Sequence, residues 1–201
     1  MRMVVGAIAL LLAPAVYLLS GAQPLTSISI SYWTDARDVF VGALIAVGFF
    51  LSAYNGAGER LDLEFYLSKA SCVFAICVAL FPTTGFGPSD SPPAWVANLS
   101  SVFGLMPKHV HYGAAVLLFA CLMAMMWFFS YRAINKGKLF RANLYRGIAV
   151  AMLFGILLIG GVGYACSWPP TILVVEVWGL SLFGIGWLLA GAYKTEPDNE
   201  R

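Results

Sequence analysis

The sequence predicts an all-α, polytopic membrane protein, a bundle of six transmembrane helices. Of its 201 residues, 60% are hydrophobic and 11% are charged, whereas a soluble domain carries about 25% charged residues. Six apolar stretches are long enough to cross a hydrocarbon layer of about 30 Å, which takes about 20 residues of α-helix. They cover residues 3–19, 39–54, 61–81, 109–131, 144–165 and 171–192.

The basic residues predict which way these helices cross. If both termini lie on one side, ten of the twelve Lys and Arg residues fall on that side, and only Arg37 and Lys108 lie opposite. Cytoplasmic loops carry an excess of Lys and Arg, so both termini are expected to be cytoplasmic. The expected location is the cytoplasmic membrane of a bacterium. The ten residues are Arg2, Arg60, Lys69, Arg132, Lys136, Lys138, Arg141, Arg146, Lys194 and Arg201.

The chain is expected to form a single transmembrane domain, residues 1–201. Its first apolar stretch resembles a secretory signal peptide, but we interpret it as a spanning helix that is bent or interrupted near Pro14. Residues 27–34 alternate polar and apolar side chains, which favours an extended segment, with Thr34 capping the second helix. The long outer loop, 82–108, contains a candidate interfacial helix that would turn five side chains toward lipid: Trp95, Val96, Leu99, Val102 and Phe103.

Ionisable residues at the outer ends of the apolar stretches are the candidate ligand-binding residues. A charge at the bilayer centre costs at least about 2.5 to 3.5 kcal/mol, so such residues are expected to face the bundle interior. Asp38 and His111 each share a helix face with small residues, and Glu176 lies near the start of the last stretch. These three side chains are therefore expected to meet at a similar depth. Just above them lie Asp35, Arg37, Lys108 and His109.

This constellation has several interpretations. The charged groups could only neutralise one another and hold the helix ends together. They could form a pocket for a lipid headgroup or another small amphiphile, or a catalytic site with carboxylates or a metal, whose ligands would be His109, His111 and Glu176. A proton-coupled transport path is disfavoured because nothing ionisable bridges the middle of the bundle. No cofactor is expected, although bound lipid is plausible, and nothing in the composition indicates a nucleic-acid partner.

Short motifs resemble a six-helix membrane family, that of the damage-regulated autophagy modulators and the GPI-lipid remodelling factors with their uncharacterised prokaryotic relatives. The motifs are Ser29, Tyr32 and the pair Arg37-Asp38 in the outer segment, residues 79–83 (ALFPT), and residues 110–114 (VHYGA). The resemblance implies six helices with inward-facing termini and a role connected with membrane lipids or with the organisation of other membrane proteins. It carries over Arg37, Asp38 and His111 as polar motif residues, and Glu176 has no counterpart.

These observations predict lipid-linked binding or remodelling at the outer leaflet. Two other functions remain open: an intramembrane hydrolase that depends on a metal or carboxylates, and an accessory or structural subunit of a larger membrane complex. Whether the protein is an enzyme, and whether it forms a homo-oligomer, are left open by the sequence.

Overall fold

 The computed structural model describes residues 1–21, 23–54, 63–87 and 89–193 of the chain. They form α-helices and one 3₁₀ helix, with no strand among them. Outside this part of the chain lie three of the basic residues predicted to be cytoplasmic, Arg60, Lys194 and Arg201, and the start of the apolar stretch 61–81. The helices are α1 (Arg2–Leu19), η1 (Ser29–Trp33), α2 (Arg37–Ser52), α3 (Leu63–Leu80), α4 (Ala94–Phe103), α5 (Pro107–Asn135), α6 (Leu139–Ala165) and α7 (Thr171–Ala192).

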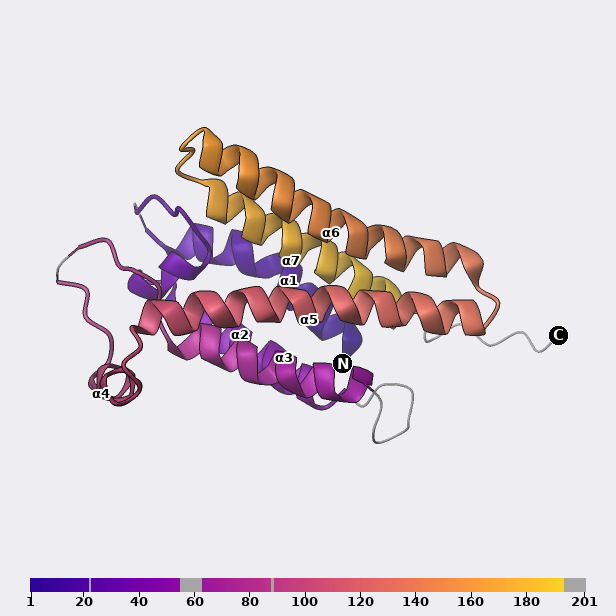
Figure 1. Cartoon of the computed structure of the whole chain (residues 1–201), viewed down its shortest axis with the longest axis horizontal. Helices are drawn as coiled ribbons and strands as arrows, with labels where there is room; N and C mark the ends of the chain where they lie inside the picture. The colour runs from indigo at the N-terminus through magenta and orange to yellow at the C-terminus, as the bar shows by residue number, and fades with distance from the viewer. Residues whose placement is uncertain (22, 55–62, 88, 194–201) are drawn as a thin grey trace.

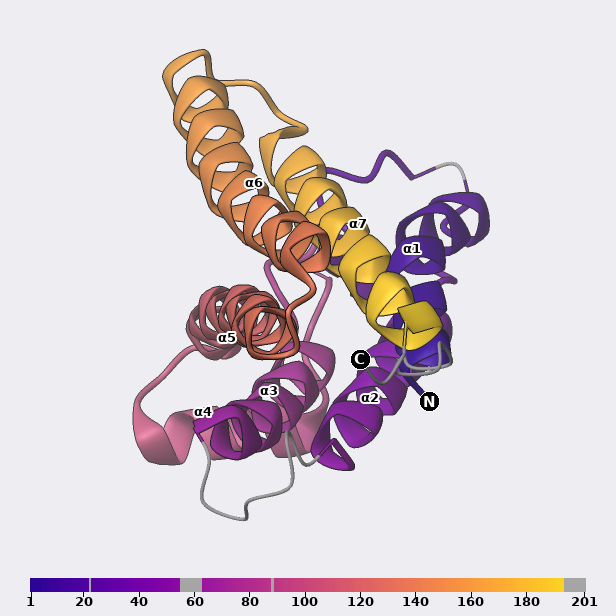
Figure 2. The same ribbon diagram turned by 90° about the vertical axis from the view of Figure 1, so that its right-hand side faces the viewer.

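Six of these helices pack side by side in a ring, and successive helices run in opposite directions. In chain order α1 packs on α2, α2 on α3, α3 on α5, α5 on α6 and α6 on α7, and α7 closes the ring against α1. Figure 2, which looks along the bundle, shows this arrangement. The all-helical fold class is therefore confirmed.

Five helices are long and apolar enough to cross a membrane: α1, α3, α5, α6 and α7. α2 has 16 residues, which at about 1.5 Å per residue is short of a hydrocarbon layer of about 30 Å. The outward face of α6 is apolar, as a lipid-facing surface requires. Its exposed side chains include Val150, Leu153, Phe154, Leu157 and Leu158.

The interior is filled by large side chains from α5, α6 and α7. Trp187, Phe183, Met125, Met126 and Met152 are each at most 1% exposed. α1 and α7 pack closely, since a Cβ added at Gly6 would lie 2.8 Å from the carbonyl oxygen of Gly184. Small residues permit this backbone approach, which is the usual way in which helices pack in a membrane.

Several local predictions need correction. Residues 29–33 form a 3₁₀ helix rather than an extended segment, because serine side chains bond to the nearby backbone: Ser31 Oγ donates to the oxygen of Ile28 at 2.6 Å. The N-cap of α2 is Ala36, not Thr34. α1 continues through Pro14.

The candidate interfacial helix is present as α4, and its axis lies across the bundle, so that it is seen end-on in Figure 1. Four of the five side chains predicted to face lipid are exposed: Trp95, Leu99, Val102 and Phe103. Val96 is fully buried, so the prediction was wrong for this residue. The orientation of α4 suits a helix lying in the plane of a membrane interface.

Candidate functional site

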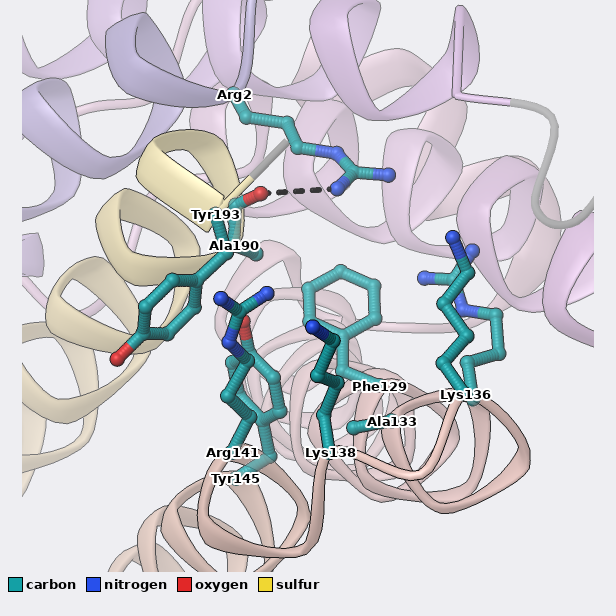
Figure 3. A pocket seen from close by; sticks show the side chains of 10 residues that line it. Arg2, Phe129, Ala133, Lys136, Lys138, Arg141, Tyr145, Ala190 and Tyr193 are labelled. Carbon is teal, nitrogen blue, oxygen red and sulfur yellow. Dashed lines mark hydrogen bonds between the residues drawn. The ribbon is translucent and has the colours of Figure 1, made fainter. Parts of the chain in front are cut away.

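A cavity lined by polar and aromatic side chains lies at the end of the bundle where α1 begins, α5 ends, α6 begins and α7 ends. We call this end the basic end. The cavity, called the basic pocket below, has a volume of about 270 Å³ and is shown in Figure 3. Its lining residues are Arg2, Phe129, Arg132, Ala133, Lys136, Lys138, Arg141, Tyr145, Ala190 and Tyr193.

Among the described residues that line the pocket, half are cationic and none is acidic. They come from three helices and the α5–α6 connection, so the cluster exists only in the folded bundle. In Figure 3 the nitrogen atoms of Arg2, Lys138 and Arg141 point toward the same space. Arg2 also donates to the carbonyl oxygen of Ala190 at 3.0 Å, which fixes the start of α1 beside the end of α7.

Two polar side chains outside the pocket lining, Glu64 and Tyr54, hold Arg132 in place. Its Nη2 lies 2.9 Å from Oε1 of Glu64, so the two side chains form an ion pair. The hydroxyl of Tyr54 donates to the same Glu64 oxygen at 2.7 Å and accepts from Arg132. Because Glu64 is 3% exposed, this network orients Arg132 at the pocket wall without giving the pocket an accessible acid.

Aromatic rings contact the three arginines of the pocket. The guanidinium carbon of Arg141 lies 3.9 Å from the centre of the Tyr193 ring. Arg132 lies 4.9 Å and Arg2 5.6 Å from the centre of Phe129. Such cation–π contacts stabilise each arginine by about 0.5 to 2 kcal/mol and restrict its side chain. The pocket is thus a preorganised set of positive charges, suited to hold an anion.

The opposite end of the bundle holds the predicted site residues. Glu176 of α7 uses both carboxylate oxygens within the protein: Oε1 accepts from the Ser29 hydroxyl at 2.8 Å, and Oε2 accepts from the backbone N–H of Ile28. The N–H of Leu173 also donates to the oxygen of Thr26 at 3.0 Å. These hydrogen bonds therefore hold the segment between α1 and α2 against α7.

His111 is also engaged with the backbone. Its Nδ1 lies 2.7 Å from the carbonyl oxygen of Phe81, and its side chain is 2% exposed, which ties the start of α5 to the end of α3. The nearby hydroxyls of Thr83 and Tyr112 are 2.7 Å apart. His109, its neighbour on the same helix turn, is exposed, and Lys108 is half-buried.

The remaining predicted residues lie on the surface. Asp35, Arg37 and Asp38 are all exposed, so the inward orientation expected for Asp38 is wrong. Arg37 turns to Tyr32, donating to its hydroxyl at 2.7 Å and lying 4.3 Å from its ring centre. Among the described residues, no ion pair joins Asp35, Asp38 or Glu176 to Arg37, Lys108 or a histidine, and no group of three His, Cys, Asp or Glu side chains is placed to hold a metal.

The basic pocket was not predicted from the sequence, because its Lys and Arg residues were interpreted as markers of the cytoplasmic side. A usable signal was present: Lys136, Lys138 and Arg141 lie within six positions, where α5 ends and α6 begins, and the same two helix ends carry Phe129 and Tyr145. Arg2 and Tyr193 reach the pocket only because the ring of helices is closed. The spacing of residues in the sequence does not reveal that closure.

The chain matches no protein-family profile, no curated protein and no solved structure.

Proposed function

We propose that this protein is a six-span integral membrane protein, with both termini cytoplasmic, that binds the anionic headgroup of a membrane lipid in its basic pocket. The observation that carries the proposal is the convergence of five cationic side chains on one cavity, with no acid among the described residues that line it. Basic pockets between transmembrane helices on the cytoplasmic side are typical sites for anionic lipid headgroups.

The proposed topology is supported by the ring of helices. α2 occupies a full place in that ring, between α1 and α3, and six crossings bring the start of α1 and the end of α7 to the same side. The hydrogen bond from Arg2 to Ala190 is consistent with this. The basic end is then the cytoplasmic end by the positive-inside rule.

The position and size of the pocket favour a lipid over a large soluble ligand. The pocket lies at the ends of apolar helices, the level at which headgroups meet the protein. Its volume of about 270 Å³ is just below the range of about 300 to 1,000 Å³ typical of small-molecule sites. A compact headgroup fits, with its acyl chains remaining in the bilayer.

This proposal keeps the predicted link with lipids but moves the site from the outer end to the inner end. At the outer end both oxygens of Glu176 are occupied by the protein's own backbone and Ser29, which favours a structural role there. The pocket supplies cations, hydroxyls and rings, so we propose binding and no catalytic step.

Native mass spectrometry of the purified protein, after exchange into mixtures of phosphatidylglycerol and phosphatidylcholine, tests the proposal. We expect selective retention of the anionic lipid, and a loss of that selectivity in Arg141→Gln. Arg146→Gln is the matched control, because Arg146 lies on the same helix and packs on an aromatic ring, Trp127, but does not line the pocket. Equal retention of both lipids by the unmodified protein would contradict the proposal.

A further inference from the structure

Another hollow lies at the opposite end of the bundle from the basic pocket, where α4 ends and α5 begins (Figure 1). Its volume is about 340 Å³, and we call it the α4 hollow. None of the described residues that line it is charged, and most of them remain exposed, so the hollow is open at the surface. Its apolar walls are formed by Pro92, Ala97, Leu105, Met106 and Pro107.

The end of α4 produces the shape of this hollow. Gly104 follows the helix with φ of 64°, the left-handed conformation that favours glycine. The chain therefore turns back, and the N–H of Leu105 donates to the carbonyl oxygen of Ser100 at 3.0 Å. A Cβ added at Gly104 would meet nothing within 4 Å. The turn thus places Leu105 and Met106 at the side of the hollow and leaves open space next to Gly104.

The surface around the α4 hollow is apolar as well. Val102 and Phe103 of α4 are 78% and 68% exposed, and Trp95 is also exposed. Residues 91–107 contain no charged side chain. A helix of this kind that lies across the bundle axis buries its apolar side chains at the boundary between lipid headgroups and acyl chains. The groups that meet the hollow at this level are acyl chains and the esters that attach them to glycerol.

Ser100 gives the α4 hollow one polar group. Ser100 is 7% exposed, and its hydroxyl has no hydrogen-bond partner among the described residues. A buried donor without a partner costs free energy. The hydroxyl can turn about the Cα–Cβ bond to another staggered position and donate to a carbonyl oxygen in the hollow. Apolar walls with a single hydroxyl match an acyl chain and its ester carbonyl better than a charged headgroup.

We propose that the α4 hollow binds an acyl chain of a membrane lipid, and that the ester carbonyl of this chain accepts a hydrogen bond from the Ser100 hydroxyl. The site is separate from the basic pocket, and in the proposed topology it faces the outer leaflet. Because only the chain and its ester enter the hollow, this site does not select lipids by headgroup charge.

The test uses the full-length protein in phosphatidylcholine vesicles that contain a phosphatidylcholine with a photoreactive diazirine in one acyl chain. Crosslinked residues are located by mass spectrometry, and labelling of residues 105–107 is divided by labelling of the lipid-facing side of α6, residues 150–158, which meets bulk lipid. We expect a ratio above one. In Ala97→Phe, whose ring fills the hollow, the ratio should fall about fourfold, the equivalent of one CH₂ group excluded. Ala94→Phe is the matched control, since Ala94 is an exposed alanine of α4 that does not line the hollow, and it should keep the ratio.

The hydrogen bond is tested separately. Ser100→Ala should lower the ratio about fivefold, a factor within the range for one neutral hydrogen bond. A photoreactive phosphatidylcholine whose chains are joined by ethers has no ester carbonyl, so it should label the unmodified protein as weakly as the ester lipid labels Ser100→Ala.

A ratio of one or less in the unmodified protein, or the same ratio in Ala97→Phe and Ala94→Phe, would overturn the acyl-chain site. A fall in Ala97→Phe with no fall in Ser100→Ala or with the ether lipid would overturn the role of Ser100. Unchanged labelling of the α6 side in each variant shows that the protein is folded and inserted. None of these results bears on headgroup selectivity at the basic pocket, so the two proposals fail independently.

Discussion

Arg132 and Glu64 form an ion pair, with 2.9 Å between Nη2 and Oε1, that joins the end of α5 to the start of α3. The hydroxyl of Tyr54 bonds to both partners and brings the end of α2 into the same network. Three neighbouring helices of the ring are thus fixed to one another directly behind the basic pocket. The network has a structural effect and also sets the position of Arg132.

Tyr54→Phe tests the structural effect, because it removes only the hydroxyl from this network. Hydrogen bonds to charged groups contribute about 1.5 to 3 kcal/mol, and we expect a loss of that size in the free energy of unfolding measured in detergent. Tyr66→Phe, at an exposed tyrosine of α3, is the control and should stay within about 0.5 kcal/mol of the unmodified protein. Equal stability of the two variants would show that the network contributes nothing.

The contact between α1 and α7 gives a second prediction. A Cβ at Gly6 would lie 2.7 Å from Cγ of Leu188 and 2.8 Å from the oxygen of Gly184, and the backbone oxygen cannot turn away as a side chain can. Gly6→Ala is therefore expected to reduce stability by about 1 to 3 kcal/mol.

The control for this change is Gly161→Ala on α6, where a Cβ would meet nothing within 4 Å. Alanine favours a helix over glycine by up to about 1 kcal/mol, so this variant should be as stable as the unmodified protein or more so. Thermal unfolding in detergent compares the two, and a Gly6→Ala protein that is no less stable than Gly161→Ala would rule out the close contact.

The sequence predicted the helices well where apolar runs stop abruptly. The last stretch matches α7 at both ends, 171 and 192, because Pro170 precedes it and polar residues follow it. α5 and α6 extend beyond the predicted runs, since helices continue past the apolar layer when their polar ends are stabilised by other contacts. Arg132, at the end of α5, is held by Glu64.

The sites were predicted less well because they depend on contacts between distant residues. Glu176 was expected to face other helices, but its partners are the backbone N–H of Ile28 and the hydroxyl of Ser29. These are uncharged groups, so no charge pattern in the sequence pairs them with Glu176. Lys138 and Arg141 were read as topology markers, and their convergence with Arg2 follows only from closure of the ring.

The topology can be tested with single cysteines in a background that lacks the four native ones. Ser89, in the 82–108 loop, and Asn135, at the end of α5, are both exposed and lie at opposite ends of the bundle. In intact cells we expect an impermeant thiol reagent to label a cysteine at 89 and not one at 135, with both labelled after lysis. Labelling at 135 alone would invert the proposed orientation.

The last prediction concerns Glu176, whose two oxygens accept from Ile28 N–H and from the Ser29 hydroxyl. In Glu176→Gln the amide oxygen can still accept from Ile28, and the Ser29 hydroxyl can rotate to accept from the new amide N–H. This variant should therefore lose less stability than Glu176→Leu, which leaves the buried Ile28 donor unpaired at a cost of about 1 to 3 kcal/mol. Both should retain lipid selectivity at the basic pocket, which lies at the other end of the bundle. Thermal unfolding and lipid retention are measured on the same samples, and a folded Glu176→Gln protein without lipid selectivity would show that the outer end, and not the basic pocket, recognises the ligand.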